Sequence, residues 1–259
     1  MNYYLNSIIN DYKKFDQVHA IALGGSSASK MADKTSDVDV YVFTEKDIPL
    51  AAREKLVKKY SSKFEVGGDY FGAGDEYFVQ GLNKQLDVMF WDKKWFENVV
   101  ENVWTKHQAS NGYSTSFLHT LNIFKIVHDL NGWLANLKEK IQTPYPNELK
   151  QNIIKRNMML MKDKPFSSYY EQIEKGIARN DANSVNHRLS AFLASYFDVI
   201  FAKNEILHPG EKRLLQIALD KCKVLPEKFE ENISKILVQP NQQTLKILSD
   251  MVENLRKIL

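Results

Sequence analysis

The spacing of hydrophobic residues divides the chain into two regions. In the first hundred residues, short apolar runs rich in Val, Ile, Phe and Tyr alternate with segments whose apolar residues recur every three or four positions. Short runs of this kind are typical of strands, and the longer spacing is typical of helices. We therefore predict strands over residues 18–23, 38–43, 77–80 and 85–91, and helices over residues 3–15, 49–62 and 92–104.

The second region has helical spacing almost throughout. Residues 183–204 carry an apolar stripe with a period near 3.6, and residues 211–222 and 241–258 carry similar stripes. Nine of the 11 glycines lie at or before Gly132, and six of the 7 prolines lie at or after Pro144. Glycine suits short loops between strands, and proline suits sharp stops between helices.

These patterns predict an α+β protein with two domains. The boundary is expected within residues 107–145, near the turn signals Asn111-Gly112 and Asn131-Gly132. We predict a domain with a mixed β-sheet at residues 1–108, followed by an all-α helical-bundle domain at residues 109–259.

Composition and charge exclude several classes of protein. The single cysteine, Cys222, excludes a disulfide framework and a Cys-based zinc site. A net charge of +3, without a Lys/Arg stripe interleaved with aromatic residues, disfavours nucleic acid as a partner. The longest apolar stretch, residues 191–202, is interrupted by Asp198 and is shorter than the roughly 20 residues that a membrane span needs. No signal-peptide pattern is visible, so we expect a cytoplasmic protein with no membrane association.

Candidate chemistry is concentrated between the first two predicted strands. The run Gly24-Gly25-Ser26-Ser27 follows the strand at 18–23, and Asp37 and Asp39 stand two positions apart at the start of the strand at 38–43. Residues two apart on a strand share a face, so we expect the two carboxylates to project together. A divalent cation such as Mg²⁺ would relieve their repulsion, and a glycine-rich turn presents N–H groups that bind phosphate.

A third carboxylate, Asp87, lies in the predicted strand at 85–91. A charge in an apolar strand is costly without a partner. If this strand pairs beside the strand that carries Asp37 and Asp39, the three carboxylates converge at one edge of the sheet. Phosphoryl and nucleotidyl transfer with two metal ions uses such an arrangement. We therefore predict Mg²⁺, as two ions, and a substrate that carries phosphates.

This pattern resembles the nucleotidyltransferase superfamily, which includes kanamycin, streptomycin and lincosamide nucleotidyltransferases, polymerase-β-like enzymes and minimal antitoxin nucleotidyltransferases. The resemblance covers about residues 18–92. Looser similarity to bacterial nucleotidyltransferases with a helical C-terminal domain continues at residues 112–113, 126–129, 132–134, 201–204 and 209–213. The resemblance implies that Gly25 and Ser26 bind the nucleotide phosphates, that Asp37 and Asp39 bind Mg²⁺, and that Asp87 is a metal ligand or the catalytic base.

Two sets of basic residues are further candidates for nucleotide binding. Many relatives have Arg directly after the Gly-Ser pair and Gly three positions beyond it, whereas this chain has Ser27 and Lys30 there. Lys30 either supplies the missing charge or is a solvated loop lysine. Lys212 and Arg213 follow a Pro-Gly pair. Resembling transferases use cations of the helical domain to bind phosphate, and the alternative is a solvated start of a helix.

The glycine-rich segment 67–77 is a candidate for binding the acceptor. It is either a long hairpin connection or a lip of the active site. As a lip, Asp75 and Glu76 would bind a cationic or hydroxyl-rich acceptor, and Tyr70 and Tyr77 would supply flat contact surfaces.

The sequence therefore favours a Mg²⁺-dependent enzyme that transfers AMP from ATP to a hydroxyl of a small molecule of the aminoglycoside or lincosamide type, with antibiotic resistance as the consequence. Two alternatives remain. One is an enzyme that nucleotidylates another protein, as antitoxin relatives do. The other is a non-catalytic module that binds a nucleotide.

Overall fold

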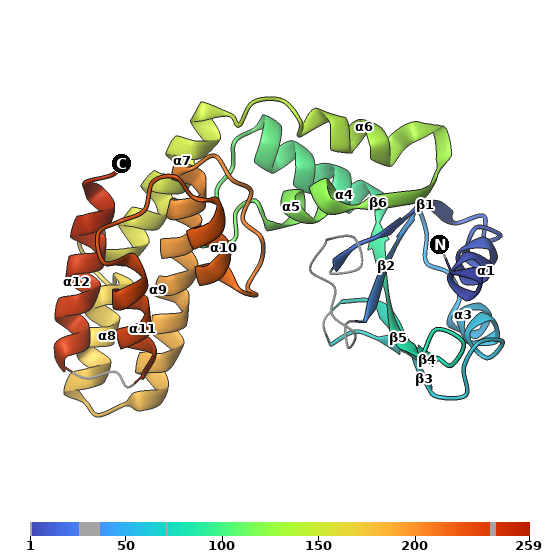
Figure 1. Ribbon diagram of the computed structural model, residues 1–259, viewed down its shortest axis with the longest axis horizontal. Coiled ribbons are helices and arrows are strands. Elements are labelled where there is room, and N and C mark those ends of the chain that lie inside the picture. Colours follow the sequence, from blue (N-terminus) through green and yellow to red (C-terminus); the bar gives the residue numbers. More distant parts are fainter. Residues whose placement is uncertain (1, 26–36, 71, 239–241) are drawn as a thin grey trace. The chain divides into compact units, whose positions relative to one another are not determined.

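The computed structural model describes residues 2–25, 37–70, 72–238 and 242–259. It divides into two compact units (Figure 1): unit 1 is Met1–Glu101 with Thr120–Thr143, and unit 2 is Asn102–His119 with Pro144–Leu259. This division differs from the single boundary predicted after residue 108. The reason is that the chain returns to unit 1 after residue 119 and adds one more strand to its sheet.

Unit 1 is built on a six-stranded mixed sheet with the order β3-β4-β5-β2-β1-β6. Strands β2 and β5 run parallel, and the other neighbouring pairs are antiparallel. All four predicted strands are present. Strands β3 and β6 were not predicted, because their sequences lack a continuous apolar run. The bounds are β1 Val18–Leu23, β2 Val38–Thr44, β3 Phe64–Gly68, β4 Gly74–Val79, β5 Lys84–Asp92 and β6 Lys125–Asp129.

Two helices cover one face of this sheet (Figure 1). These are α1 (Tyr3–Tyr12) and α3 (Leu50–Val57), whose apolar side chains pack against alternate residues of the strands. On β2 the buried residues Val38, Val40 and Val42 point toward these helices. Because side chains alternate along a strand, Asp39 and Tyr41 point to the opposite face.

Aromatic residues cover part of that opposite face. Trp91 of β5 lies 5.1 Å from Phe96 of α4 (Lys93–Val100), and Phe43 of β2 lies 5.3 Å from Trp133 of α6 (Trp133–Lys140), measured between ring centroids. After α4 the chain continues as a π-helix over Glu101–Thr105. The rest of the face, toward β3 and β4, carries polar residues.

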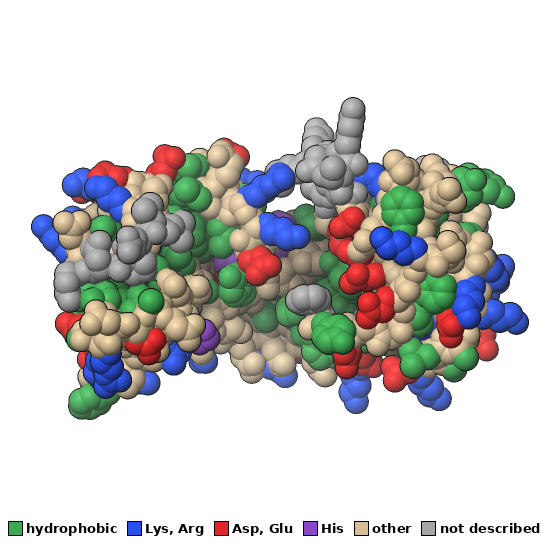
Figure 2. All heavy atoms as spheres, turned by 90° about the horizontal axis from the view of Figure 1, so that it is seen from below, with side chains coloured by type: hydrophobic (Ala, Val, Ile, Leu, Met, Phe, Trp, Pro, Cys, Tyr) green, Lys and Arg blue, Asp and Glu red, His purple; other side chains and the backbone are tan. Residues whose placement is uncertain are grey.

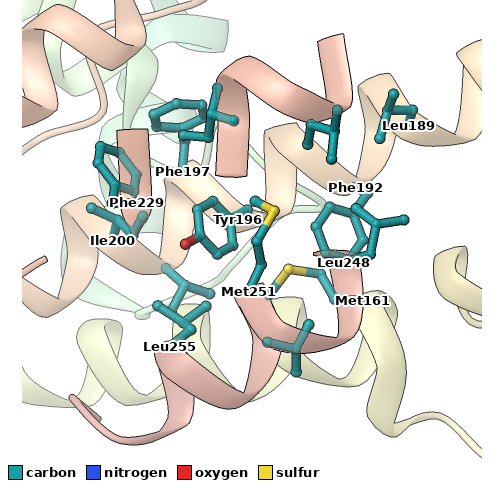
Figure 3. Close-up of a cluster of buried hydrophobic side chains, with 14 of the residues drawn as sticks. Met161, Leu189, Phe192, Tyr196, Phe197, Ile200, Phe229, Leu248, Met251 and Leu255 are labelled. Atoms are coloured by element: carbon teal, nitrogen blue, oxygen red, sulfur yellow. The ribbon is translucent and has the colours of Figure 1, made fainter. Parts of the chain in front are cut away.

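Unit 2 is helical, as predicted. Its helices are α7 Asn147–Met158, α8 Tyr169–Ala178, α9 Ala182–Lys203, α10 Leu214–Lys221, α11 Phe229–Val238 and α12 Gln242–Arg256, and α5 (Ser116–Ile123) begins in it. The predicted stripe of α9 forms the centre of the core, where Phe192, Tyr196 and Ile200 pack with Met251 and Leu255 of α12 (Figure 3). No helix in the described part of the chain is both long and apolar enough to cross a bilayer.

A buried carboxylate on α9 ties the start of unit 2 to the helix bundle. Asp198 is 1% exposed and accepts hydrogen bonds from the Ser114 N–H (3.1 Å), the Ser114 hydroxyl (2.7 Å) and the Asn157 amide (3.0 Å). Asn157 in turn accepts a hydrogen bond from the Gly112 N–H at 2.9 Å. Burial raises the pKa of Asp198 to about 6, and the hydrogen bonds from Ser114 and Asn157 oppose that rise.

The raised pKa predicts that the carboxyl of Asp198 destabilises unit 2 as pH increases. A folded-state pKa of about 6 against the usual 3.8 means that the stabilising contribution is complete below pH 3.8 and is lost as pH rises through 6. The free energy of unfolding of the wild type, minus that of Asp198→Asn, should therefore fall by about 3 kcal/mol across this window. Denaturant unfolding of both proteins at several pH values tests this. A difference that does not change with pH would contradict it.

Candidate functional site

Two acidic residues lie opposite each other on the parallel strands. Asp39 of β2 is paired in register with Asp87 of β5. Neighbouring strands lie roughly 4.8 Å apart, so two carboxylates on the same face at this register are close neighbours. The predicted pairing of the two strands is confirmed. Its consequence is a pair of acids on the face of the sheet that α1 and α3 leave uncovered.

The backbone at Gly25 lies directly against one of these carboxylates. Gly25 has a φ of 60°, and a Cβ added there would come within 1.6 Å of Asp39 Oδ2. The Gly24 N–H donates to the Asp39 carbonyl oxygen at 3.0 Å, which holds the glycine turn on β2. Only glycine leaves room for the carboxylate at this position, so the glycine turn and the acid pair belong to one structure.

Acidic residues continue in register across two more strands. Asp87 is paired with Glu76 of β4, and Glu76 is paired with Glu65 of β3. The row Glu65, Glu76, Asp87 and Asp39 therefore crosses four neighbouring strands, and we call it the acidic row. Figure 2 shows acidic side chains gathered on one face of the sheet-containing unit, on the right of the view. Like charges directly opposite each other are destabilising in a sheet without compensation.

Negative charge in and beside the acidic row acts on Glu76. The pKa of Glu76 is raised, first by partial burial and then by the negative charges of Asp87, Glu65 and Asp37. The amide of Gln85 donates to Asp87 Oδ1 at 2.8 Å and to Glu76 Oε2 at 3.4 Å, so it lies between these two carboxylates. Burial raises the pKa of Tyr41, and the charges of Asp39 and Asp87 raise it further. A cation bound here would remove this repulsion.

A cavity of about 440 Å³ opens beside the acidic row. All four members of the row line it, together with Tyr70 and Met89. Every lining residue belongs to unit 1. The cavity therefore provides space for a ligand next to the Asp39–Asp87 pair.

The predicted phosphate-binding and metal-binding residues are only partly described. Gly24 and Gly25 lie beside Asp39, as described above, and Asp37 is exposed just before β2, near enough for its charge to act on Glu76. Ser26, Ser27 and Lys30 lie outside the described residues. Lys212 and Arg213 are exposed in unit 2 and precede α10, which begins at Leu214.

The glycine-rich segment differs from the expected lip. Residues 74–77 belong to strand β4. The pairing of β4 with β5 begins at Gly74, which lies opposite Met89. Alternation along β4 separates the predicted acceptor residues: Glu76 points into the cavity face, whereas Asp75 and Tyr77 are each 1% exposed on the face covered by α1 and α3. Asp75 there accepts a hydrogen bond from Arg53. The side chains of Asp75 and Tyr77 therefore lie on the face away from the cavity, although Asp75 is among the residues that line it. The acceptor role of both residues stays a prediction. Tyr70 is 86% exposed.

Sequence reasoning missed three residues of this region. Glu65 and Gln85 belong to the cavity face only because of the strand register, and Arg53 is buried behind the sheet. The alternation of Phe64, Glu65 and Val66 was a weak strand signal that could have drawn attention to Glu65. The partners of Glu65, Gln85 and Arg53 could not be predicted from spacing along the sequence, because each partner lies on a different strand or helix.

The donor set at this site fits a metal that the substrate helps to hold. Among the residues that the structure describes, no group of three or more His, Cys, Asp or Glu could hold a metal ion. Asp39 and Asp87 form a pair, and Mg²⁺ commonly takes one or two carboxylates and completes its coordination with water and substrate phosphates. The Gly25 backbone, which leaves room for the Asp39 carboxylate, agrees with this.

Comparison with known proteins identifies the part of the chain that holds this site. Residues 5–109, less than half of the chain, match the family model of the nucleotidyltransferase domain. A search of curated proteins finds no match.

Three solved structures show distant likeness over nearly the whole chain. A nucleotidyltransferase-like protein from Exiguobacterium sibiricum has 10% identity and a TM-score of 0.46, with 98% of this chain and 72% of that chain covered. A STING-associated CdnE c-di-GMP synthase from Capnocytophaga granulosa has 11% identity and a TM-score of 0.31, with coverage of 98% and 77%. The Thermotoga maritima CCA-adding enzyme complexed with tRNA has 12% identity and a TM-score of 0.31, with coverage of 99% and 82%. These likenesses are too distant to indicate a substrate.

The contact between Gly25 and Asp39 predicts a specific effect of one methyl group. Gly25→Ala should lose the thermal stabilisation by Mg²⁺–ATP, because the new Cβ displaces the Asp39 carboxylate. Gly132→Ala is the matched control, since Gly132 has a similar φ of 69° and no atom within 4 Å of an added Cβ. Both variants should carry a similar backbone strain of about 1–2 kcal/mol. Equal nucleotide responses in the two variants would contradict the prediction.

Proposed function

We propose that this protein is a nucleotidyltransferase that transfers AMP from ATP to a hydroxyl group of a small molecule, because residues 5–109 match the family model of the nucleotidyltransferase domain. The observation that carries this proposal is the in-register pair of Asp39 and Asp87 with the Gly25 backbone against it. The two carboxylates would serve as metal ligands, and the Gly24–Gly25 backbone beside them would bind phosphate.

In the proposed reaction, an acceptor hydroxyl oxygen attacks the α-phosphorus of ATP. A phosphorus–oxygen bond to the acceptor forms, the bond between the α-phosphorus and the bridging oxygen breaks, and pyrophosphate leaves with that electron pair. Asp87 would take the hydroxyl proton as the base, or it would serve only as a metal ligand while the proton passes to water. Gly24, Gly25, Ser26 and Ser27 would hold the β- and γ-phosphates.

Cations on the chain would complete the binding of the triphosphate. Lys30, Lys212 and Arg213 are the candidates that the family resemblance indicates. Asp37, Asp39 and Asp87 would hold Mg²⁺, as one or two ions, and the metal would supply stabilisation of negative charge on the phosphate oxygens. The repulsion within the acidic row supports this assignment, because bound cations would offset it.

The acceptor that fits the cavity best carries hydroxyl groups and positive charge. Glu76 faces the cavity, where a cationic group would meet it and the neighbouring Glu65, and Tyr70 offers a flat exposed surface. Acceptors of the aminoglycoside or lincosamide type have these properties, so we propose them as substrates and antibiotic resistance as the biological effect. A protein acceptor, as for antitoxin relatives, is the alternative that the same chemistry permits.

The first test concerns the acid pair. Mg²⁺–ATP should raise the melting temperature of the wild type. At an ATP concentration of a hundred times Kd, the free energy of unfolding should increase by about 2.7 kcal/mol, and EDTA should remove the effect. Asp39→Asn and Asp87→Asn should abolish pyrophosphate release and keep or slightly increase stability without ligand, because each removes one of two crowded charges. Asp47→Asn, an exposed acid outside the site, is the control.

Two outcomes would contradict the proposed reaction. One is the absence of any thermal shift with all four nucleoside triphosphates. The other is clear destabilisation by both variants of the acid pair, because this would indicate a structural role for Asp39 and Asp87. Nucleotide binding without turnover of any acceptor would favour a non-catalytic module.

The second test concerns the acceptor. Glu76→Gln should weaken binding of a polycationic aminoglycoside by about 1.5–3 kcal/mol for a lost charge-assisted hydrogen bond, and added salt should reduce the difference between wild type and variant. ATP binding should be unchanged. Glu54→Gln, an exposed acid on α3, is the control. The measurement is pyrophosphate release with a panel of aminoglycosides and lincosamides. If none is turned over while a co-purifying protein becomes labelled from α-³²P-ATP, the protein-modifying alternative replaces this one.

A further inference from the structure

A buried ion pair lies directly behind the cavity face of the sheet. Arg53 Nη2, on α3, lies 2.8 Å from Asp75 Oδ1, on β4, and the two side chains are only 7% and 0% exposed. The Arg53 guanidinium also lies over the ring of Phe90 on β5, 4.3 Å from its centroid. A buried charge without a partner is costly, so each of the two charges requires the other. This pair therefore fixes α3 to the middle of the sheet.

The same carboxylate also holds the end of β3. The Gly67 N–H donates to Asp75 Oδ1 at 2.9 Å, at a point where the pairing of β3 with β4 changes register between Val66 and Gly68. Gly67 has a φ of 83°, and a Cβ there would lie 2.8 Å from Leu50 Cδ2 of α3. Gly67 is thus packed against α3 and hydrogen-bonded to Asp75. One carboxylate oxygen connects α3, β3 and β4.

The residues just beyond this junction line the cavity. Gly68, Tyr70, Gly72 and Gly74 belong to the same cavity lining as Asp39 and Asp87, and we call these four residues the acceptor wall. Three of the four are glycines, which impose little conformational preference of their own. Backbone pairing of Gly68 with Gly74, and of Gly74 with Met89 of β5, holds part of the wall. The rest of its position depends on how its ends are held. Asp75 is next to Gly74, and Gly67 is next to Gly68.

We propose that the Arg53–Asp75 ion pair is a positioning device that holds the acceptor wall at a fixed place relative to Asp39 and Asp87. This inference rests on the proposed function, because it assigns the wall to the acceptor rather than to the nucleotide. The side chain of Asp75 lies on the face away from the cavity and acts through Gly67 and Gly74. Orientation of the reacting groups contributes strongly to rate, so a displaced wall lowers turnover of the acceptor. Nucleotide binding depends on Gly25 and Asp39 and is not affected.

The decisive variant removes both charges together. In Arg53→Met/Asp75→Leu the buried pair is replaced by apolar side chains of similar volume, a change that is often neutral or stabilising. The variant therefore retains the fold and loses the link to Gly67. The matched control is Glu54→Leu/Lys58→Met, which removes an ion pair of 2.6 Å from the exposed side of the same helix. Exposed pairs of this kind contribute little. If the double variant does not fold, Arg53→Lys takes its place, because it keeps the positive charge but not the planar guanidinium group.

The experiment combines hydrogen exchange with kinetics. In the charge-free variant, amide exchange at Gly67 and Gly68 should become faster, while exchange in β2 and β5 and the thermal shift by Mg²⁺–ATP stay as in the wild type. With the aminoglycoside or lincosamide that the wild type turns over, kcat/KM for the acceptor should fall on the order of tenfold to a hundredfold, mainly through kcat, at an unchanged KM for ATP. The control variant should match the wild type in every measurement.

Two results would overturn the positioning role. One is unchanged exchange at Gly67 and Gly68, which decides the matter whether or not an acceptor is found. The other is a parallel change in the KM values for acceptor and ATP, because a general loss of structure affects both. If Mg²⁺–ATP does not raise the melting temperature of the wild type, the proposed function is contradicted instead. The amide exchange at Gly67 and Gly68 still decides whether the ion pair holds the wall.

Discussion

The parallel pairing of β2 with β5 is the constraint on which the rest of unit 1 depends. It brings Asp39 opposite Asp87, although the two residues are far apart in the sequence. Parallel neighbours cannot be joined by a tight turn and require a long crossover. Here residues 45–83 form that crossover, and they contain α3, β3 and β4. The connection that the pairing requires therefore also supplies the helix behind the sheet and the two strands that extend the acidic row.

Alternation of side chains lets the same strands serve two purposes. On β4, Glu76 faces the cavity, whereas Asp75 and Tyr77 are buried beneath α1 and α3. Glu76 is exposed among other negatively charged side chains, and Asp75 beside it in the sequence forms an ion pair with Arg53. Burial raises the pKa of both carboxyl groups, yet only the side chain of Glu76 faces the cavity. Residue type alone does not distinguish them, because the distinction lies in the face of the strand.

The acidic row is the feature of the fold that costs stability. Four carboxylates in register repel one another, and Gln85 offsets part of this repulsion by donating to two of them. Proteins commonly depart from locally favourable arrangements at functional sites. Unit 2 shows a contrasting solution, in which the single buried carboxylate of Asp198 is surrounded by hydrogen-bond donors that join distant segments. That acid has a structural role, whereas the row faces a cavity.

Periodicity and short motifs such as Gly24-Gly25 with Asp37 and Asp39 are enough to predict the α+β class, the four apolar strands, the helical second region and the likeness of the first hundred residues to a nucleotidyltransferase domain. Tertiary structure alone decided what depends on register and on pairing between distant segments. Strands β3 and β6 form because neighbouring strands accept their hydrogen bonds, although their own apolar patterns are weak. Strand register likewise brings Glu65 to the cavity face and turns the side chain of Asp75 to the opposite face. Spacing along a chain shows which residues share a strand face, and only the assembled sheet shows what that face meets.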